Sequence, residues 1–170
     1  DYQTAAQTFI TYYNSYPRGT FAELARFHAG KGLCLDTPEA RLDQSGTYKA
    51  IQELQMFLEY FPNSTKKSEA QNMIFELQDK LVQKELLSAR LYYNLGNYMG
   101  NNFLSCVVTA QNALKDYPYT HYREDLSILI AGCGTSQAAK HAIRNPNARV
   151  TGIDFSSKSI DDGIININEW

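Results

Sequence analysis

The stretch AIQELQMFLEYFP (residues 50–62) indicates how this chain folds. Its apolar side chains recur at steps of three and four, which is the spacing of one face of an α-helix. The final proline cannot continue the backbone hydrogen-bond ladder, so the helix is expected to end just before it. Two other segments end in the same way, AAQTFITYYNSYP (residues 5–17) and CVVTAQNALKDYP (residues 106–118). The chain therefore repeats one helical pattern.

The three segments agree position by position when they are aligned on the proline. An aromatic residue stands directly before it, and apolar residues stand four, eight and twelve positions before it. Steps of four place these side chains on one helix face, with a small residue at the last position, where helices approach closely. The residues directly before the proline are Tyr16, Phe61 and Tyr117, and those four positions before it are Tyr13, Leu58 and Leu114. Eight positions before it are Phe9, Leu54 and Ala110, and twelve positions before it are Ala5, Ala50 and Cys106.

A second apolar helix is predicted after each proline, in TFAELARFHAG (residues 20–30), KKSEAQNMIFELQDKLV (residues 66–82) and YREDLSILI (residues 122–130). Helix, turn and helix in this order is the tetratricopeptide plan, and residues 84–118 come close to one full unit of about 34 residues. We therefore predict a mainly α fold, with about six or seven antiparallel helices stacked in pairs.

One connector differs from the rest. LCLDTPEARLDQSGTYKA (residues 33–50) contains a Thr-Pro and a Ser-Gly, together with several charges, and is predicted to be an ordered loop between the second and third helices. Loops on a rigid helical scaffold often carry binding function, so this loop is a candidate site. A solvated connector is the alternative.

Composition excludes several classes of function. The chain has 170 residues, 44% of them hydrophobic, which is enough to bury a core. Its 16 basic and 18 acidic residues give a net charge of −2, and nucleic-acid binding needs a basic surplus. The three cysteines form neither a disulfide framework nor a zinc pattern, and the histidines have no metal-ligand spacing. No nucleophile has a catalytic motif around it. We therefore expect no metal and no catalytic residue.

Residues 1–130 resemble BamD of the Bacteroidetes type, the tetratricopeptide lipoprotein of the outer-membrane β-barrel assembly machinery. The resemblance is carried by TPEARLDQ (residues 37–44), KAIQELQMFLEYFPNS (residues 49–64), ELQDKLVQKE (residues 76–85) and SARLYYNLGNY (residues 88–98). It implies a non-enzymatic scaffold without a cofactor, at the periplasmic face of the outer membrane. The implied partners are the barrel insertase and nascent outer-membrane proteins, with Arg41, Asp43 and Gln44 in a client-binding surface. Any membrane anchor is expected to lie outside this chain.

Residues 127–160 resemble the opening of a class I S-adenosylmethionine-dependent methyltransferase. In ILIAGCGTSQAAKHAIRNPNARVTGID, residues 128–131 are expected to form a buried parallel strand, and Gly132 and Gly134 a tight turn beside the cofactor. Asp154, at the end of a second strand, would accept hydrogen bonds from ribose hydroxyls.

Two domains are accordingly predicted, a helical repeat domain over residues 1–126 and an incomplete Rossmann-like fragment over residues 127–170. The alternative function is a cytoplasmic methyltransferase with an N-terminal repeat domain, using S-adenosylmethionine. A sheet of two strands lacks the neighbours that hold such a site rigid, so this chain is expected to be inactive as a methyltransferase.

Overall fold

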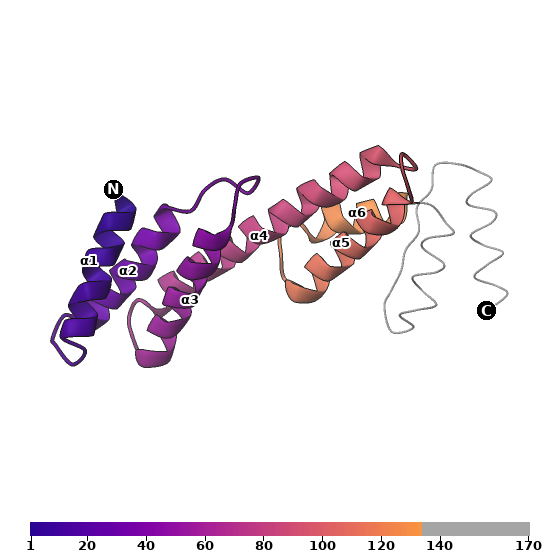
Figure 1. Ribbon diagram of the computed structural model, residues 1–170. Helices are drawn as coiled ribbons and strands as arrows, with labels where there is room; N and C mark the ends of the chain where they lie inside the picture. Colours follow the sequence, from indigo (N-terminus) through magenta and orange to yellow (C-terminus); the bar gives the residue numbers. More distant parts are fainter. Residues whose placement is uncertain (134–170) are drawn as a thin grey trace. The chain divides into compact units, whose positions relative to one another are not determined.

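The computed structural model describes residues 1–133, and this part of the chain consists of six α-helices and their connections (Figure 1). The helices are α1 (Tyr2–Ser15), α2 (Ala22–Leu35), α3 (Ser45–Tyr60), α4 (Lys67–Leu95), α5 (Asn102–Asp116) and α6 (Arg123–Gly132). The predicted mainly helical, tetratricopeptide-like fold is confirmed.

The aromatic–proline turns are three copies of one structure. Helices α1, α3 and α5 each end two residues before the proline, and the aromatic residue between them is the C-cap. Its φ and ψ angles are −130° and 63° at Tyr16, −129° and 62° at Phe61, and −131° and 70° at Tyr117. Each of these residues donates its backbone N–H to the carbonyl four residues earlier, at 2.9 Å. The sequence alignment on the proline is therefore a structural alignment as well.

The turn that follows each proline is also closed by the backbone. The carbonyl of the aromatic C-cap accepts from the N–H three residues later, which belongs to Gly19, Ser64 and Thr120 at 3.0, 3.1 and 3.3 Å. The next helix begins five residues after each proline, at Ala22, Lys67 and Arg123. Local backbone bonding thus returns the chain antiparallel to the preceding helix.

Burial confirms the predicted inward face in the second and third segments and corrects it in the first. Leu54 and Ala110, eight residues before the proline, are fully buried. In α1 the corresponding Phe9 is 36% exposed and Ala5 is exposed, whereas Ala6 and Tyr13 are buried. Helix α1 packs on α2 and has no described neighbour on its other side, so its inward face is narrower and rotated.

Helix α4 corrects the prediction of two helices over residues 66–82 and from residue 84. It is one helix of 29 residues, since no glycine or proline interrupts residues 67–95. It ends at Leu95, and the turn that follows contains Gly96 at φ 55° and Gly100 at φ 142°, a backbone region that favours glycine. No helix within residues 1–133 is both long enough and apolar enough to span a membrane.

The described helices form two compact units, the first being Asp1–Leu81 and the second beginning at Val82. In the first unit α2 lies between α1 and α3, and Phe27 and Phe57 meet with ring centroids 5.4 Å apart. A Cβ added at Gly30 of α2 would lie 2.7 Å from a Leu54 methyl carbon, so glycine permits this close approach. In the second unit α4, α5 and α6 share a core of small and aliphatic side chains: Val82, Leu86, Ala89, Cys106, Val107, Ala110, Ala113, Leu126 and Cys133.

The strand predicted over residues 128–131 is wrong. These residues belong to α6, which begins with Glu124 and Asp125 in its first turn, where carboxylates stabilise a helix. Leu126 and Ala131 are buried while Ile128 is 65% exposed. This alternation is the burial pattern of a helix, whereas a buried parallel strand would be covered at every residue. The remainder of the predicted Rossmann-like fragment, from residue 134, lies outside the described residues.

Candidate protein-interaction surface

The candidate loop is shorter than predicted. Helix α2 continues to Leu35 and α3 begins at Ser45, so the α2–α3 loop comprises residues 36–44. Both predicted loop ends are helical, and at the α3 end Thr47 and Ala50 are buried one turn apart on the inward face. The TPEARLDQ motif coincides with residues 37–44 of this loop.

Gln44 organises the loop from inside. Its side chain is only 3% exposed, and its Nε2 donates to the backbone carbonyls of Glu39 at 2.8 Å and Leu42 at 3.1 Å. Its Oε1 accepts from the hydroxyl of Thr47, which is fully buried, at 2.7 Å. The structure therefore gives Gln44 a positioning role and not the surface-contact role expected from the resemblance.

Two further side chains fix the ends of the loop. At its start the Thr37 hydroxyl donates to the Cys34 carbonyl at 2.8 Å and accepts from Lys80 Nζ of α4 at 2.5 Å. At its end Asp43 accepts from both the backbone N–H and the hydroxyl of Ser45, at the start of α3. The loop is thus held in one conformation by side chains on both sides of it.

The outer side of this loop is polar with one apolar residue. Arg41 and Asp43 are both exposed, as is Glu39, and Leu42 is 57% exposed. Within residues 1–133 no hydrogen bond or ion pair engages the Arg41 side chain. The structure brings Arg41 and Asp43 together on the exposed side of an ordered loop, as a binding surface requires.

At the helix ends opposite to the loop, α1, α2 and α3 are joined by an arginine between two tyrosines. The guanidinium carbon of Arg26 on α2 lies 4.6 Å from the ring centroid of Tyr13 on α1 and 4.1 Å from that of Tyr60 on α3. The Tyr13 hydroxyl donates to Glu53 Oε2 at 3.1 Å. Burial, reinforced by this carboxylate, raises the pKa of Tyr13. These contacts join three helices through polar and aromatic groups.

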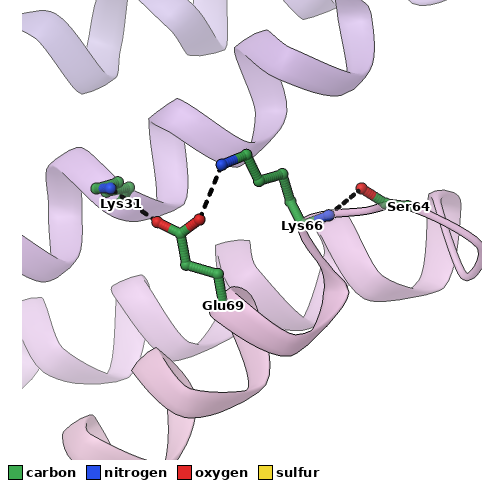
Figure 2. A network of polar contacts seen from close by, with 4 residues as sticks. All are labelled: Lys31, Ser64, Lys66 and Glu69. Carbon is green, nitrogen blue, oxygen red and sulfur yellow. Dashed lines mark hydrogen bonds and ion pairs between the residues drawn. The ribbon is translucent and has the colours of Figure 1, made fainter.

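A charged cluster joins α2 to the first turn of α4 (Figure 2). The carboxylate of Glu69 lies between two ammonium groups, 2.8 Å from Lys31 Nζ and 3.0 Å from Lys66 Nζ. Hydrogen bonds from Lys31 and then Lys66 hold the pKa of Glu69 below its usual value. The backbone N–H of Lys66 donates to the Ser64 hydroxyl at 3.0 Å, which fixes the start of the helix. Lys66 and Glu69 are neighbours three residues apart on the chain, whereas Lys31 and Glu69 are 38 residues apart, so no local sequence signal points to the second pair.

A shallow pocket opens at the α3–α4 turn. It is lined by the half-buried Glu23 of α2 and by the turn itself: Tyr60, Phe61, Pro62, Asn63, Ser64 and Thr65. Sequence reasoning missed this pocket, although it identified the aromatic residue before each proline, which here is the half-buried Phe61. The pocket lies at the opposite helix ends from the α2–α3 loop.

The sequence model of the family described as YfiO, outer membrane lipoprotein, matches residues 1–143. The chain belongs to the YfiO family. The match supports the BamD-like resemblance over the helical repeats, and with it a connection to outer-membrane assembly. Both the YfiO match and helix α6 continue past residue 126, where the sequence suggested a junction.

The metal and cofactor predictions concern few residues within the described part of this YfiO-family chain. No three metal-ligating side chains gather at one point in this part of the structure. Gly132 is the last residue of α6 and is exposed, while Gly134 and Asp154 lie outside the described residues. The cofactor-binding role suggested for these three residues stays a prediction.

Proposed function

We propose that this YfiO-family chain is a non-enzymatic protein-interaction scaffold at the periplasmic face of the outer membrane. It would contact nascent β-barrel proteins and the barrel insertase. Membership of an outer membrane lipoprotein family supports the location, and a stack of helices with an ordered, exposed loop supports the role.

The observation that carries the proposal is the internal bonding of the α2–α3 loop. Gln44 and Thr37 satisfy backbone carbonyls inside the loop, and Lys80 holds it to α4. A loop that is ordered before binding loses little conformational entropy when a partner docks. This loop therefore suits recognition more than it suits a passive connector.

The chemistry of the loop fits an extended polypeptide. Arg41 offers a fork of N–H donors, Glu39 and Asp43 offer carboxylate acceptors, and Leu42 offers apolar contact. Nascent barrel strands alternate apolar and polar side chains, with unpaired backbone groups on both edges. Such a strand needs both kinds of contact side by side.

The second unit suits the insertase as its partner. The BamD-like resemblance implies that the later repeats dock there, and this unit exposes Leu104 and Val108 on α5 at 41% and 45%. These two side chains are one helical turn apart and form an apolar strip beside polar neighbours. Obligate partners cover strips of this kind.

The proposal is tested with a variant that removes two exposed charges of the loop, one positive and one negative. Arg41→Ala combined with Asp43→Asn should weaken binding of an extended peptide from an outer-membrane barrel protein by about tenfold, as expected for the loss of one or two charged hydrogen bonds. Asparagine keeps an acceptor for Ser45, so the start of α3 is retained. Fluorescence anisotropy with a labelled peptide measures the dissociation constant.

The matched control removes one positive and one negative charge elsewhere in the first unit. Lys49→Ala with Glu59→Gln changes two exposed residues of α3 and should leave binding unchanged. Equal affinities for both variants and the unaltered chain would reduce the α2–α3 loop to a connector.

A further inference from the structure

Two of the three cysteines meet in the core of the second unit. Cys106 is on α5 and fully buried, and Cys133, directly after α6, is 6% exposed. They belong to one core cluster, and their thiols are hydrogen-bonded to each other. Helices α5 and α6 are antiparallel across a short turn, so the first turns of α5 lie beside the end of α6.

We propose that Cys106 and Cys133 are the site of an intramolecular disulfide that joins the C-terminal end of α6 to α5. Thiols at hydrogen-bonding distance need only a small shift to bond, provided that an oxidant reaches them. The site goes beyond the scaffold function, and no spacing in the sequence suggests it, because the two residues are separated by a helix, a turn and a second helix.

Access to the pair runs through the end of α6. Helix ends open locally far more often than the whole fold unfolds, and Cys133 lies just past the last helical residue. The hydrogen bond from Cys133 lowers the pKa of Cys106, and the same bond, reinforced by burial, raises the pKa of Cys133. In the folded pair Cys106 is therefore the more readily ionised of the two thiols, and the thiolate is the attacking species.

The reaction is a thiol–disulfide exchange with a disulfide oxidant such as oxidised glutathione. The Cys106 thiolate attacks one sulfur of the oxidant, whose S–S bond breaks and releases one reduced thiol. The Cys133 thiolate then attacks the mixed disulfide and releases the second reduced thiol. Two cysteine thiols are oxidised, one external disulfide is reduced, and the two protons leave with the released thiols.

The bond would close a loop containing the α5–α6 pair. Cross-linking of this kind stabilises mainly by restricting the unfolded chain, and the gain grows with the length of the loop. Disulfides persist in oxidising compartments such as the bacterial periplasm. This last point rests on the proposed location, whereas the geometry of the pair does not.

The third cysteine provides a clean background for the test. Cys34 lies in the first unit and is half-buried, so Cys34→Ser leaves the Cys106–Cys133 pair intact. The full chain carrying Cys34→Ser is incubated folded with oxidised glutathione, then unfolded and alkylated. We expect no alkylated thiol and a mass lower by two hydrogen atoms. A non-reducing digest should yield a linked peptide that contains both cysteines.

Thermal unfolding gives an independent readout. The oxidised Cys34→Ser chain should melt roughly 5–10 °C above its reduced form, and a reductant should reverse the shift. The same chain with Cys133→Ser in addition should lose the linked peptide and the shift. Two alkylated thiols after oxidation, or glutathione adducts in place of the internal bond, would overturn the proposal. None of these measurements involves a client peptide, so they stand or fall separately from the scaffold function.

Discussion

The α2–α3 loop and the three aromatic–proline turns connect the same kind of helix by different means. Each turn is closed by its own backbone, at Tyr16, Phe61 and Tyr117, with nearly identical angles. Besides backbone hydrogen bonds such as that from the Leu42 N–H to the Glu39 carbonyl, the loop is held by side chains, and one of them, Lys80, comes from a helix far along the sequence. A turn of the first kind builds the repeat, whereas the loop interrupts it and exposes side chains such as Arg41 and Leu42.

The largest expected effect concerns the buried side chains of the helix that ends at the second turn. Phe57 is fully buried one residue before the half-buried Leu58, near the end of α3. Phe57→Ala should cost about 3–5 kcal/mol of the free energy of unfolding, because it leaves a cavity between α2 and α3. Leu58→Ala should cost less than half as much. Urea denaturation of both variants measures the difference, and equal losses would contradict the inward face described for α3.

The α2–α3 loop should depend on Gln44 in a way that no turn depends on a single side chain. Gln44→Ala removes the partner of two backbone carbonyls and of the buried Thr47 hydroxyl. Leaving such groups unpaired costs about 1–3 kcal/mol, and the loop should also become more mobile. Denaturation combined with amide hydrogen exchange over residues 37–44 measures both effects. Unchanged exchange would show that the loop is ordered without Gln44.

The contrast between turns and loop also explains which parts of the structure could be predicted from the sequence. Proline and the aromatic residue before it act locally, so the ends of α1, α3 and α5 were predictable. The narrower face of α1 was not, because it depends on which neighbours a helix has. Arg41 and Asp43 could be identified as exposed loop residues, but the burial of Gln44 depends on Thr47, and the Cys106–Cys133 pair depends on the packing of two helices.

A smaller effect is expected from the contact between the loop and Lys80 of α4. Lys80→Met keeps the aliphatic stem and removes the donor to the Thr37 hydroxyl, which should cost about 0.5–1.5 kcal/mol. Lys67→Met, on the same helix at an exposed position, should have no measurable cost. Thermal melts of the two variants provide the comparison. If both behave alike, α4 does not hold the loop.

The smallest effect should come from Glu69, because its ion pairs are exposed and screened by solvent. Its pKa is lowered in the folded chain, so its contribution to stability is present above the ordinary carboxyl pKa. That contribution is lost as the pH falls through the lowered value. Glu69→Gln should therefore be slightly less stable than the unaltered chain at neutral pH and equal to it at low pH. High salt should also shrink the difference, and a difference that grows in acid would contradict this sign.

The most direct test of the account asks which surface a client touches. A photo-reactive amino acid is placed at position 41 in the α2–α3 loop or, as a control, at the exposed position 49 on α3. Each chain is illuminated with an unfolded outer-membrane barrel protein, and cross-linked product is quantified by gel. We predict strong cross-linking from position 41, little from position 49, and loss of the position 41 product when Gln44→Ala is added. Equal cross-linking from both positions, or none from position 41, would contradict the proposal that this loop receives nascent barrel proteins.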